Sequence, residues 1–401
     1  MPTVTKVCPA CGWRWMHGAS IRSSACPRCS AGEASAIRAE AARKKSTRAH
    51  FRESLDICRS NRCGHWGINE QGRRGCLLHA QCPAKIDAHL MAGGACLSDP
   101  QQFGPAFVPA KHVRGLHVLT FHFNPAGFRR LAETYRQWVG SMGSLPVTCV
   151  ELVVGDGEPE IPNSHVVRGD DRYLVWQKEA LLNVGLRLLP PEARYVAWID
   201  HDILIDDEDW AVKSVEVIGN RSVAIQPWGR MHYLDRTGNT VREAESASAI
   251  AKSGRYPATG PGAAWIARRE DLEMIGGIYD KNIVGGGDLV WFHSLSGMRV
   301  DFLQRQSPEI RRHQEAWIRH VGGRIGWDCY PAEARHIWHG EAKNRQYVAR
   351  DAILKDHGYD PERHVELDGQ GVLRWSEAAP RGLREAVRKY FDDRREDGGG
   401  G

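Results

Sequence analysis

Long apolar runs are absent from this chain of 401 residues. No stretch approaches the roughly 18 consecutive apolar residues that a membrane-spanning helix needs. The first residues, MPTVTKVCPACGW, also lack the apolar core of a secretion signal. We therefore expect neither a membrane span nor export, and we expect a cytoplasmic location. No internal repeat is visible.

Cysteine is scarce beyond residue 115, where only two of the 11 cysteines occur. The other nine lie in residues 1–115, several of them at CxxC spacing. In a chain without a secretion signal, this pattern favours metal ligation over disulfide bonds.

Two CxxC pairs near the N-terminus predict a zinc ribbon. Cys8 and Cys11 are followed, after 14 residues, by Cys26 and Cys29. Four thiolates at this spacing typically bind one tetrahedral Zn²⁺ in a closed structural site. Reduced cysteines without a metal are the alternative.

A second cysteine group follows at irregular spacing. We predict that a second Zn²⁺ is bound by Cys58, Cys63, Cys76 and Cys82, although the spacing leaves the ligand set open. Residues 98–109 contain three prolines and one glycine, which is typical of a linker.

Charge is unevenly distributed along the chain. Residues 1–115 hold 17 Lys and Arg against 7 Asp and Glu, a surplus of +10; the totals of 54 and 49 leave 37 against 42, or −5, for the remainder. Part of the surplus is a basic run over residues 43–52 in a segment with helix-forming composition. Such a run fits either a solvated helix face or contacts with phosphates.

From about residue 111 the pattern changes to strands alternating with helices. Apolar runs at 116–121, 147–154 and 195–199 predict strands, and the segments 125–140 and 173–189 predict helices. This alternation predicts an α/β fold with a mostly parallel sheet.

The strand predicted at 195–199 is followed directly by Asp200, His201 and Asp202. Ligands bind outside the carboxyl ends of strands in open α/β sheets. Two carboxylates there raise each other's pKa unless a cation lies between them, and Mg²⁺ or Mn²⁺ prefers such oxygen ligands. An acidic junction between strand and turn is the alternative interpretation.

Four motifs in this order resemble the GT-A glycosyltransferases. They are WQKEALLNVG at 176–185, the Asp-x-Asp after the strand, GPGAAWIARREDLEMIGGI at 260–278 and GGGDLVWFH at 285–293. The likeness covers roughly residues 113–350. It is greatest to the β-1,4-galactosyltransferase and polypeptide N-acetylgalactosaminyltransferase group and their family-2-like phage and bacterial relatives.

The resemblance implies a divalent cation, Mn²⁺ or Mg²⁺, held by Asp200, Asp202 and His339, with His336 as the competing histidine. It implies that Asp288 removes the acceptor proton. Position 287 departs from the group, since glycine stands where the group usually has glutamate. The resemblance also implies donor contacts by Phe121, His122, Asn124, Asp156, Lys178, Asp200, Gly262 and Gly287.

The chemistry of sugar transfer fits these residue types. A metal ion that neutralises charge on a departing diphosphate lowers the barrier, and a carboxylate within hydrogen-bond reach acts as general base toward a hydroxyl. Glycines before Asp288 permit close backbone approach. A surface turn, an exposed helix lysine at 178 and a core tryptophan at 265 are the alternatives for these positions.

We accordingly expect a zinc ribbon at 1–35, a basic helix with a second zinc segment at 36–110, a GT-A domain at 111–358, and a C-terminal extension with a helix opening at Pro380 and a disordered tail. The expected activity is inverting, metal-dependent transfer from a nucleotide sugar, with UDP as the expected nucleotide.

The basic front suggests a polyanionic acceptor, and we expect DNA bearing a hydroxymethylated pyrimidine, as in phage genome modification. On that expectation the location is the host cytoplasm. Protein or cell-surface polysaccharide is the alternative acceptor. A catalytically silent, zinc-dependent nucleic-acid-binding protein is the alternative from another class.

Overall fold

The computed structural model describes residues 107, 109–257, 259–298, 301–347 and 349–398, together with four short strands nearer the N-terminus. The chain divides into two compact units, residues 1–100 and 101–401. In the first unit, β1 (Val4–Val7) pairs with β2 (Arg14–His17), and β3 (Trp66–Ile68) pairs with β4 (Arg74–Cys76). Apart from Cys76, which ends β4, the cysteines predicted to bind zinc lie outside the described residues.

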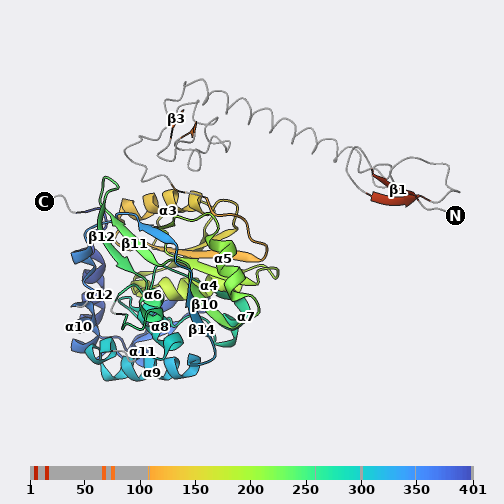
Figure 1. Ribbon diagram of the computed structural model, residues 1–401. Helices are drawn as coiled ribbons and strands as arrows, with labels where there is room; N and C mark the ends of the chain where they lie inside the picture. The colour runs from red at the N-terminus through yellow and green to blue at the C-terminus, as the bar shows by residue number, and fades with distance from the viewer. Residues whose placement is uncertain are drawn as a thin grey trace. The chain divides into compact units, whose positions relative to one another are not determined.

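A seven-stranded sheet forms the centre of the second unit (Figure 1). The spatial order is β14 (Gly326–Cys329), β10 (Val223–Gln226), β13 (Ala264–Arg268), β8 (Tyr195–Ile199), β5 (Leu116–Phe123), β6 (Val147–Val154) and β7 (His165–Gly169). Neighbouring strands run parallel except around β13, which is antiparallel to both β8 and β10. The prediction of an α/β fold with a mostly parallel sheet is therefore confirmed.

A smaller sheet lies beside the carboxyl end of β8. Its order is β12 (Thr240–Glu245), β11 (Arg230–Leu234), β15 (Glu333–His336) and β9 (Ile203–Ile205). Only a short turn separates β8 from β9, closed by the bond from the N–H of Ile203 to the carbonyl of Asp200 at 3.0 Å. The two aspartates of the Asp-x-Asp motif therefore lie where the two sheets meet.

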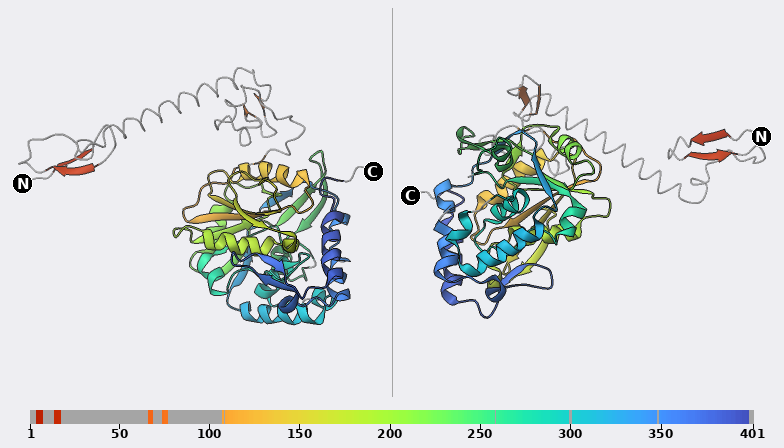
Figure 2. Two further views of the ribbon diagram at one scale, coloured as in Figure 1. Left: turned by 180° about the vertical axis from the view of Figure 1, so that it is seen from behind. Right: turned by 60° about the horizontal axis from the view of Figure 1, so that its bottom comes forward.

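Helices cover both faces of the main sheet (Figures 1 and 2). One face packs against α3 (Arg129–Ser141) and α5 (Trp210–Ile218). The other packs against α4 (Lys178–Leu188), α6 (Ala247–Lys252), α7 (Arg269–Met274) and α8 (Gly287–Ser296). Strand alternation explains the division, since neighbouring side chains point to opposite faces: Val118 lies in the first core and Leu119 in the second.

The C-terminal part packs into the same unit. Its helices are α9 (Pro308–Val321), α10 (Ala349–Asp356), α11 (Pro361–His364) and α12 (Arg381–Asp393), with the short 3₁₀ helices η5 (Asp301–Arg305) and η6 (Ala342–Arg345). Its two short strands are β16 (Val365–Leu367) and β17 (Leu373–Trp375). A further 3₁₀ helix, η4 (Asp171–Tyr173), lies earlier in the chain, just before α4. A third core cluster joins Val175, Ala180 and Val290 to Tyr390 and Phe391 of α12. In the described part, no helix combines the length and apolar character needed to cross a bilayer.

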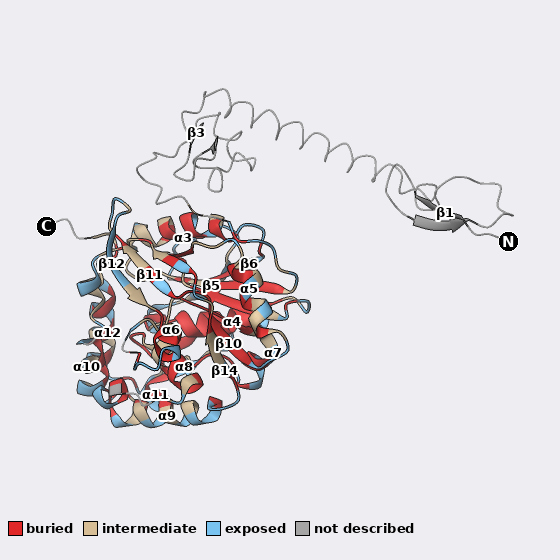
Figure 3. Ribbon diagram, in the orientation of Figure 1, coloured by how far each residue is buried: buried red, intermediate tan, exposed pale blue. Residues whose placement is uncertain are grey.

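The expectation of a disordered tail is wrong for residues 392–398. These residues belong to the described part, and Glu396 is 1% exposed. Figure 3 shows that buried residues extend through the sheets and onto the inner side of α12. The charged composition of DDRRED suggested solvation, but the structure gives several of these charges buried partners.

Most predicted elements agree with the structure, with differences at their ends. The strands predicted at 147–154 and 195–199 coincide with β6 and β8. The first strand continues to Phe123, so Phe121 and His122 lie within β5 and not in the loop after it. The sequence also predicts one helix over residues 341–357, but the structure has η6 and α10 there, and Gln346 between them adopts a positive φ of 50°.

Replacing Ile266 by alanine should destabilise the sheet. Ile266 is fully buried in β13 and lies opposite Ile225 and Ala197. We expect Ile266→Ala to lower the free energy of unfolding by about 2–5 kcal/mol, because the lost side chain leaves a cavity. Denaturant titration measures this. Val241→Ala, at a residue 66% exposed on β12, should stay within about 0.5 kcal/mol of the parent; equal losses would contradict this account of the core.

Candidate functional site

A pocket lies where β5 and β8 end, in the region where ligands bind to open α/β sheets. Its walls come from the end of β5, the turn after β8, the first residues of α4 and α8, the segment after β15, and the end of α12. The lining residues are Phe121, Phe123, Asn124, Pro125, Ala126, Phe128, Leu131, Trp176, Gln177, Lys178, Glu179, Asp200, His201, Asp202, Gly286, Asp288, His339, Arg345, Tyr347, Arg350, Phe391, Arg394 and Glu396.

Lys178 joins the two acidic motifs inside this pocket. Its Nζ lies 2.7 Å from Asp200 Oδ1 and 3.0 Å from Asp288 Oδ1. The lysine side chain is 7% exposed, whereas that of Asp288 is 36% exposed. The predicted Lys178, Asp200 and Asp288 are thus brought together, and the alternative of an exposed helix lysine is wrong because Lys178 is buried against these carboxylates.

Three acidic side chains lie around Lys178. Burial lowers the pKa of Lys178, but the charges of Asp200 and Asp288 outweigh burial and raise it above its ordinary value. Burial raises the pKa of Asp200 to about 7, against the opposing charge of Lys178 and with support from Asp288 and Asp202. Burial and Asp288 raise the pKa of Glu179 to about 8, although Lys178 opposes the shift. Three acids thus compete for the charge of one lysine, and burial favours the protonated form of Glu179 and Asp200.

Two of the predicted glycines allow acids to approach the backbone. A Cβ on Gly262 would lie 2.2 Å from Asp288 Oδ2, and a Cβ on Gly287 would lie 2.2 Å from Glu179 Oε1. Just before Asp288, Gly285 and Gly286 have φ values of 83° and 94°, which favour glycine. The carboxylate of Glu179 therefore lies beside the position where the resembling group carries an acidic side chain of its own.

Asp202 faces two histidines from the segment around the end of β15. Pairing of β9 with β15 places Ile203 opposite His336, and the N–H of Ile337 donates to the carbonyl of Asp202 at 2.8 Å. His339 Nε2 lies 2.5 Å from Asp202 Oδ2, and His336 Nε2 lies 3.5 Å from the same oxygen. One ligand atom from each of these three residues lies within 4.8 Å of the others.

The two histidine rings are held by stacking. The rings of His336 and His339 are 5.1 Å apart and nearly parallel at 13°. Tyr233 of β11 stacks on the other side of His336 at 5.0 Å, and the Arg242 guanidinium of β12 lies 3.5 Å from the centre of the Tyr233 ring. This column of rings extends from the β11–β12 hairpin to the predicted ligand His339.

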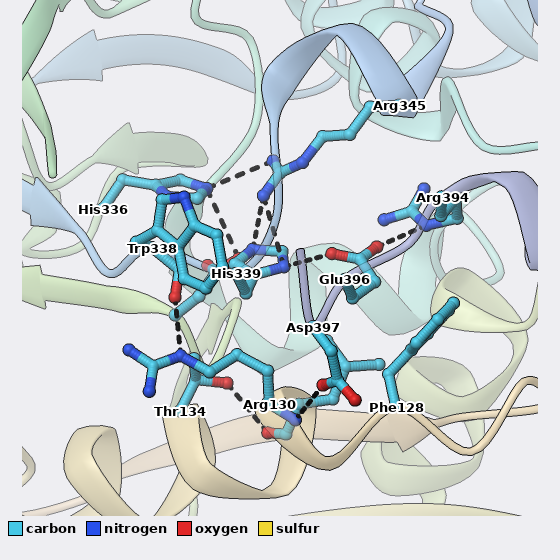
Figure 4. A network of polar contacts seen from close by, with 12 residues as sticks. Phe128, Arg130, Thr134, His336, Trp338, His339, Arg345, Arg394, Glu396 and Asp397 are labelled. Atoms are coloured by element: carbon cyan, nitrogen blue, oxygen red, sulfur yellow. Dashed lines mark hydrogen bonds and ion pairs between the residues drawn. The ribbon is translucent and has the colours of Figure 1, made fainter. Parts of the chain in front are cut away.

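The donor atoms around Asp202 fit a divalent cation. His339 Nδ1 contacts the Glu396 carboxylate, and Arg345 Nη2 lies 2.5 Å from His339 Nε2 (Figure 4). When Nδ1–H donates to Glu396, Nε2 is the ring nitrogen left to act as a metal ligand, and it lies on the side of Asp202. Asp202 Oδ1 is buried and has no hydrogen-bond partner among the described residues. One carboxylate and two imidazoles form a mixed oxygen and nitrogen donor set that could hold a divalent metal ion.

The side chains that group together are not the same three as the predicted ligands Asp200, Asp202 and His339. Asp200 is engaged by Lys178, and it is His336 that groups with Asp202 and His339. Burial lowers the pKa of His336 to about 3, so this ring is neutral, as a metal ligand must be. His201 points elsewhere, packing against Tyr135 and lying 3.2 Å from Thr134 Oγ1.

Guanidinium groups line the pocket near these residues. Arg345, Arg350 and Arg394 all contribute to its walls, and Arg394 lies 5.1 Å from the centre of the Trp176 ring. Within the described residues, the Trp176 indole N–H is buried without a hydrogen-bond acceptor. Arginines beside a cation site suit a ligand that carries phosphate groups.

The remaining residues predicted to contact the nucleotide-sugar donor lie in different environments. Phe121 and Asn124 line the pocket, but the Asn124 side chain is occupied in the turn, accepting from the N–H of Phe128 at 2.9 Å. His122 is buried and lies 2.9 Å from Glu160 Oε2. Asp156 is exposed and does not line the pocket. Trp265 is 2% exposed and packs in the core, where its indole donates to the carbonyl of Pro261.

Sequence reasoning did not identify several residues that line the pocket. Glu179 stands next to Lys178 in the motif at 176–185. The sequence signal that could have identified Glu179 was this pair of opposite charges near the start of a helix. Arg350 lies on α10, Arg394 directly follows the end of α12, and Glu396 lies in the polar segment after it. No local spacing connects these positions with Asp202.

Solved structures with some likeness to this chain are glycosyltransferases. A β1,4-galactosyltransferase 7 mutant from Drosophila, in complex with manganese, UDP-Gal and xylobiose, is 13% identical over 66% of this chain and 95% of its own, with a TM-score of 0.32. The mannosyltransferase PcManGT from Pyrobaculum calidifontis, in complex with GDP-Man and Mn²⁺, is 16% identical over 69% and 74%, with a TM-score of 0.33. GalNAc-T7 with UDP, GalNAc and Mn²⁺ is 15% identical over 71% and 56%, with a TM-score of 0.33. No protein-family profile and no curated protein sequence matches the chain.

Adding a methyl group at Gly262 should disturb the contact between Lys178 and Asp288. The Cβ of Gly262→Ala would collide with the Asp288 carboxylate, so Asp288 must move away. We expect a loss of about 1–3 kcal/mol in the free energy of unfolding and a displaced Asp288 in a crystal structure of the variant. Gly369→Ala is the matched control, because a Cβ there meets open space. An unmoved Asp288 at parental stability would refute the predicted collision.

Proposed function

We propose that this chain is a metal-dependent glycosyltransferase of the GT-A type that moves a sugar from a nucleotide sugar to a hydroxyl acceptor. One observation carries the proposal: Asp202 and His339, which group with His336, line the same pocket as Lys178 and its two carboxylate partners, Asp200 and Asp288. A cation site and a separate carboxylate are the two parts that this chemistry requires.

The donor's diphosphate would lie between the cation ligands and the arginines. Asp202, His336 and His339 would hold Mn²⁺ or Mg²⁺, while Lys178 holds Asp200. When bound, the ion supplies Lewis-acid stabilisation of the leaving diphosphate. Arg345, Arg350 and Arg394 add fixed positive charge along the wall of the pocket, which offsets the charge that develops on the departing group.

The apolar end of the pocket suits the nucleoside. Phe121, Phe123 and Phe128 lie together with Trp176 among the lining residues, and aromatic faces of this kind stack on nucleobases. UDP is the nucleotide that the resemblance implies. Asp156 does not line the pocket, so we assign the base contact to the phenylalanines.

Asp288 is the proposed general base. Its Oδ1 is held by Lys178, and Oδ2 packs against Gly262, which fixes the carboxylate with its side chain partly open to solvent. An acceptor hydroxyl would transfer its proton to Asp288 while its oxygen forms the bond to the anomeric carbon and the nucleoside diphosphate leaves. Such a single displacement inverts the anomeric configuration.

The proposed acceptor is DNA bearing a hydroxymethylated pyrimidine. The support is the charge division in the sequence, with +10 in residues 1–115 and −5 in the remainder, together with the cysteine pairs near the N-terminus. The zinc-binding segments would then deliver a polyanion to the catalytic unit. The target base would have to leave the duplex stack to reach Asp288.

Manganese-dependent donor hydrolysis tests the enzyme assignment. We expect the parent protein to hydrolyse a UDP-sugar slowly when Mn²⁺ is present and to lose this activity in excess chelator. Asp202→Ala should abolish the manganese-stimulated rate, because Asp202 is the one carboxylate of the proposed donor group Asp202, His336 and His339. Asp356→Asn, at an exposed position on α10, should retain the parental rate. A variant Asp202→Ala with full manganese-stimulated hydrolysis would exclude the proposed metal site.

Incubation with hydroxymethylated and unmodified DNA tests the acceptor. With a panel of nucleotide sugars, nucleoside mass spectrometry should detect a hexose adduct only on the hydroxymethylated DNA. Asp288→Asn should slow adduct formation by about 10²–10⁴-fold, because the general base is lost. Transfer to protein or polysaccharide, with no DNA adduct, would overturn the DNA assignment but leave the enzyme class intact.

A further inference from the structure

We propose that residues 394–398 form a C-terminal strap that positions the histidine ligand His339 through Glu396 and caps helix α3 through Asp397. This inference rests on the proposed function for the role of His339 as a metal ligand. The capping role stands on hydrogen bonds that involve no metal.

Glu396 is a buried acid whose partners explain its position. It is 1% exposed, and burying a carboxylate is costly unless charged partners surround it. One oxygen contacts His339 Nδ1, and the other accepts from Arg394 Nε at 2.5 Å. Both partners and Glu396 line the pocket, so the carboxylate lies directly behind the predicted ligand.

The contact with Glu396 determines which nitrogen of His339 faces Asp202. An imidazole that donates Nδ1–H to a carboxylate presents the lone pair of Nε2 on its other side. Nε2 is the atom that lies 2.5 Å from Asp202 Oδ2. A carboxylate behind a ligating histidine fixes the ring's tautomer and orientation and increases its basicity. Glu396 is therefore a positioning residue that acts through His339.

Asp397 caps a helix that begins far away in the sequence. The first backbone N–H groups of a helix have no intrahelical acceptor, and Phe128 at the N-cap of α3 offers no side-chain acceptor. Asp397 Oδ1 accepts from the N–H of Arg130 at 2.7 Å, and Oδ2 accepts from the N–H of Arg129 at 3.3 Å. A carboxylate at this end also interacts favourably with the helix dipole.

Further contacts hold the C-terminal strap in one path. Arg236 Nη2 donates to the carbonyl groups of Asp397 at 3.2 Å and Gly398 at 3.1 Å. Arg130 Nε donates to the carbonyl of Trp338 at 2.9 Å, so the residue next to His339 is tied to the same helix start (Figure 4). Gly340 has a φ of 88°, and a Cβ there would lie 2.9 Å from the carbonyl of Arg395. The segments 336–340, 394–398 and the first turn of α3 thus interlock.

Manganese binding to the full-length protein tests the role of Glu396. We expect Glu396→Gln, which keeps the size of the side chain but removes its charge, to weaken Mn²⁺ binding by about 10–100-fold in isothermal titration, with little change in melting temperature. Asp392→Asn removes one carboxylate from an exposed position on α12 and should bind Mn²⁺ like the parent. Parental Mn²⁺ affinity in Glu396→Gln would overturn the positioning role.

Hydrogen exchange tests the cap without any metal. We expect Asp397→Ala to speed exchange of the Arg129 and Arg130 amides roughly fivefold, while Mn²⁺ affinity stays within about threefold of the parent. Unchanged exchange at these amides would overturn the cap. If the parent binds no Mn²⁺, the metal requirement of the proposed function and the role assigned to Glu396 both fail, and the exchange result alone then decides whether the strap caps α3.

Discussion

The contact of Lys178 with two carboxylates is the constraint on which the rest of the pocket depends. A buried lysine with one acid would be a closed pair, but Lys178 is shared by Asp200 and Asp288, with Glu179 beside it. Burying several acids beside one lysine is unfavourable unless they are protonated or further positive charge can approach. Arginines and cation donors both line the walls of the pocket, and Arg345 contacts His339 directly.

The backbone around these charges is adapted to them. Glycine at 262 and 287 leaves room for carboxylates that any side chain would displace. The short turn from β8 to β9 directs Asp200 and Asp202 toward different partners, a lysine and two histidines respectively. The pairing of β9 with β15 then sets the distance from Asp202 to His336 and His339. A strand register in the smaller sheet thereby determines the geometry of the donor set.

The sequence predicted those strands and motifs that are determined by residues close together in the chain. The apolar runs at 147–154 and 195–199 gave β6 and β8 their observed limits, and the Asp-x-Asp after β8 identified the edge of the sheet where the pocket lies. The resemblance indicated His339 as a ligand, and His336 stands three residues before it as the competing histidine. The glycines before Asp288 indicated the unusual backbone at the start of α8.

What depended on distant contacts could not be predicted from local pattern. Glu396 appears in a run of charged residues that resembles a solvated tail, and only its packing against His339 and Arg394 gives it a buried position. The choice between Asp200 and His336 as a member of the donor set required knowing where Lys178 lies. Asp156 follows a strand, as nucleotide-contacting acids do in the resembling group, but it is exposed and does not line the pocket.

The stacking of Arg242 on Tyr233, of Tyr233 on His336, and of His336 on His339 affects which metal ions the donor set would prefer. Since both imidazoles are already stacked, an incoming ion would freeze few additional side-chain torsions, and the entropic penalty of coordination would be small. A rigid donor set cannot adjust its metal–ligand distances to each ion. The ionic radius of each divalent metal would then decide how well it binds, because the β11–β12 hairpin holds the distances among the donor atoms constant.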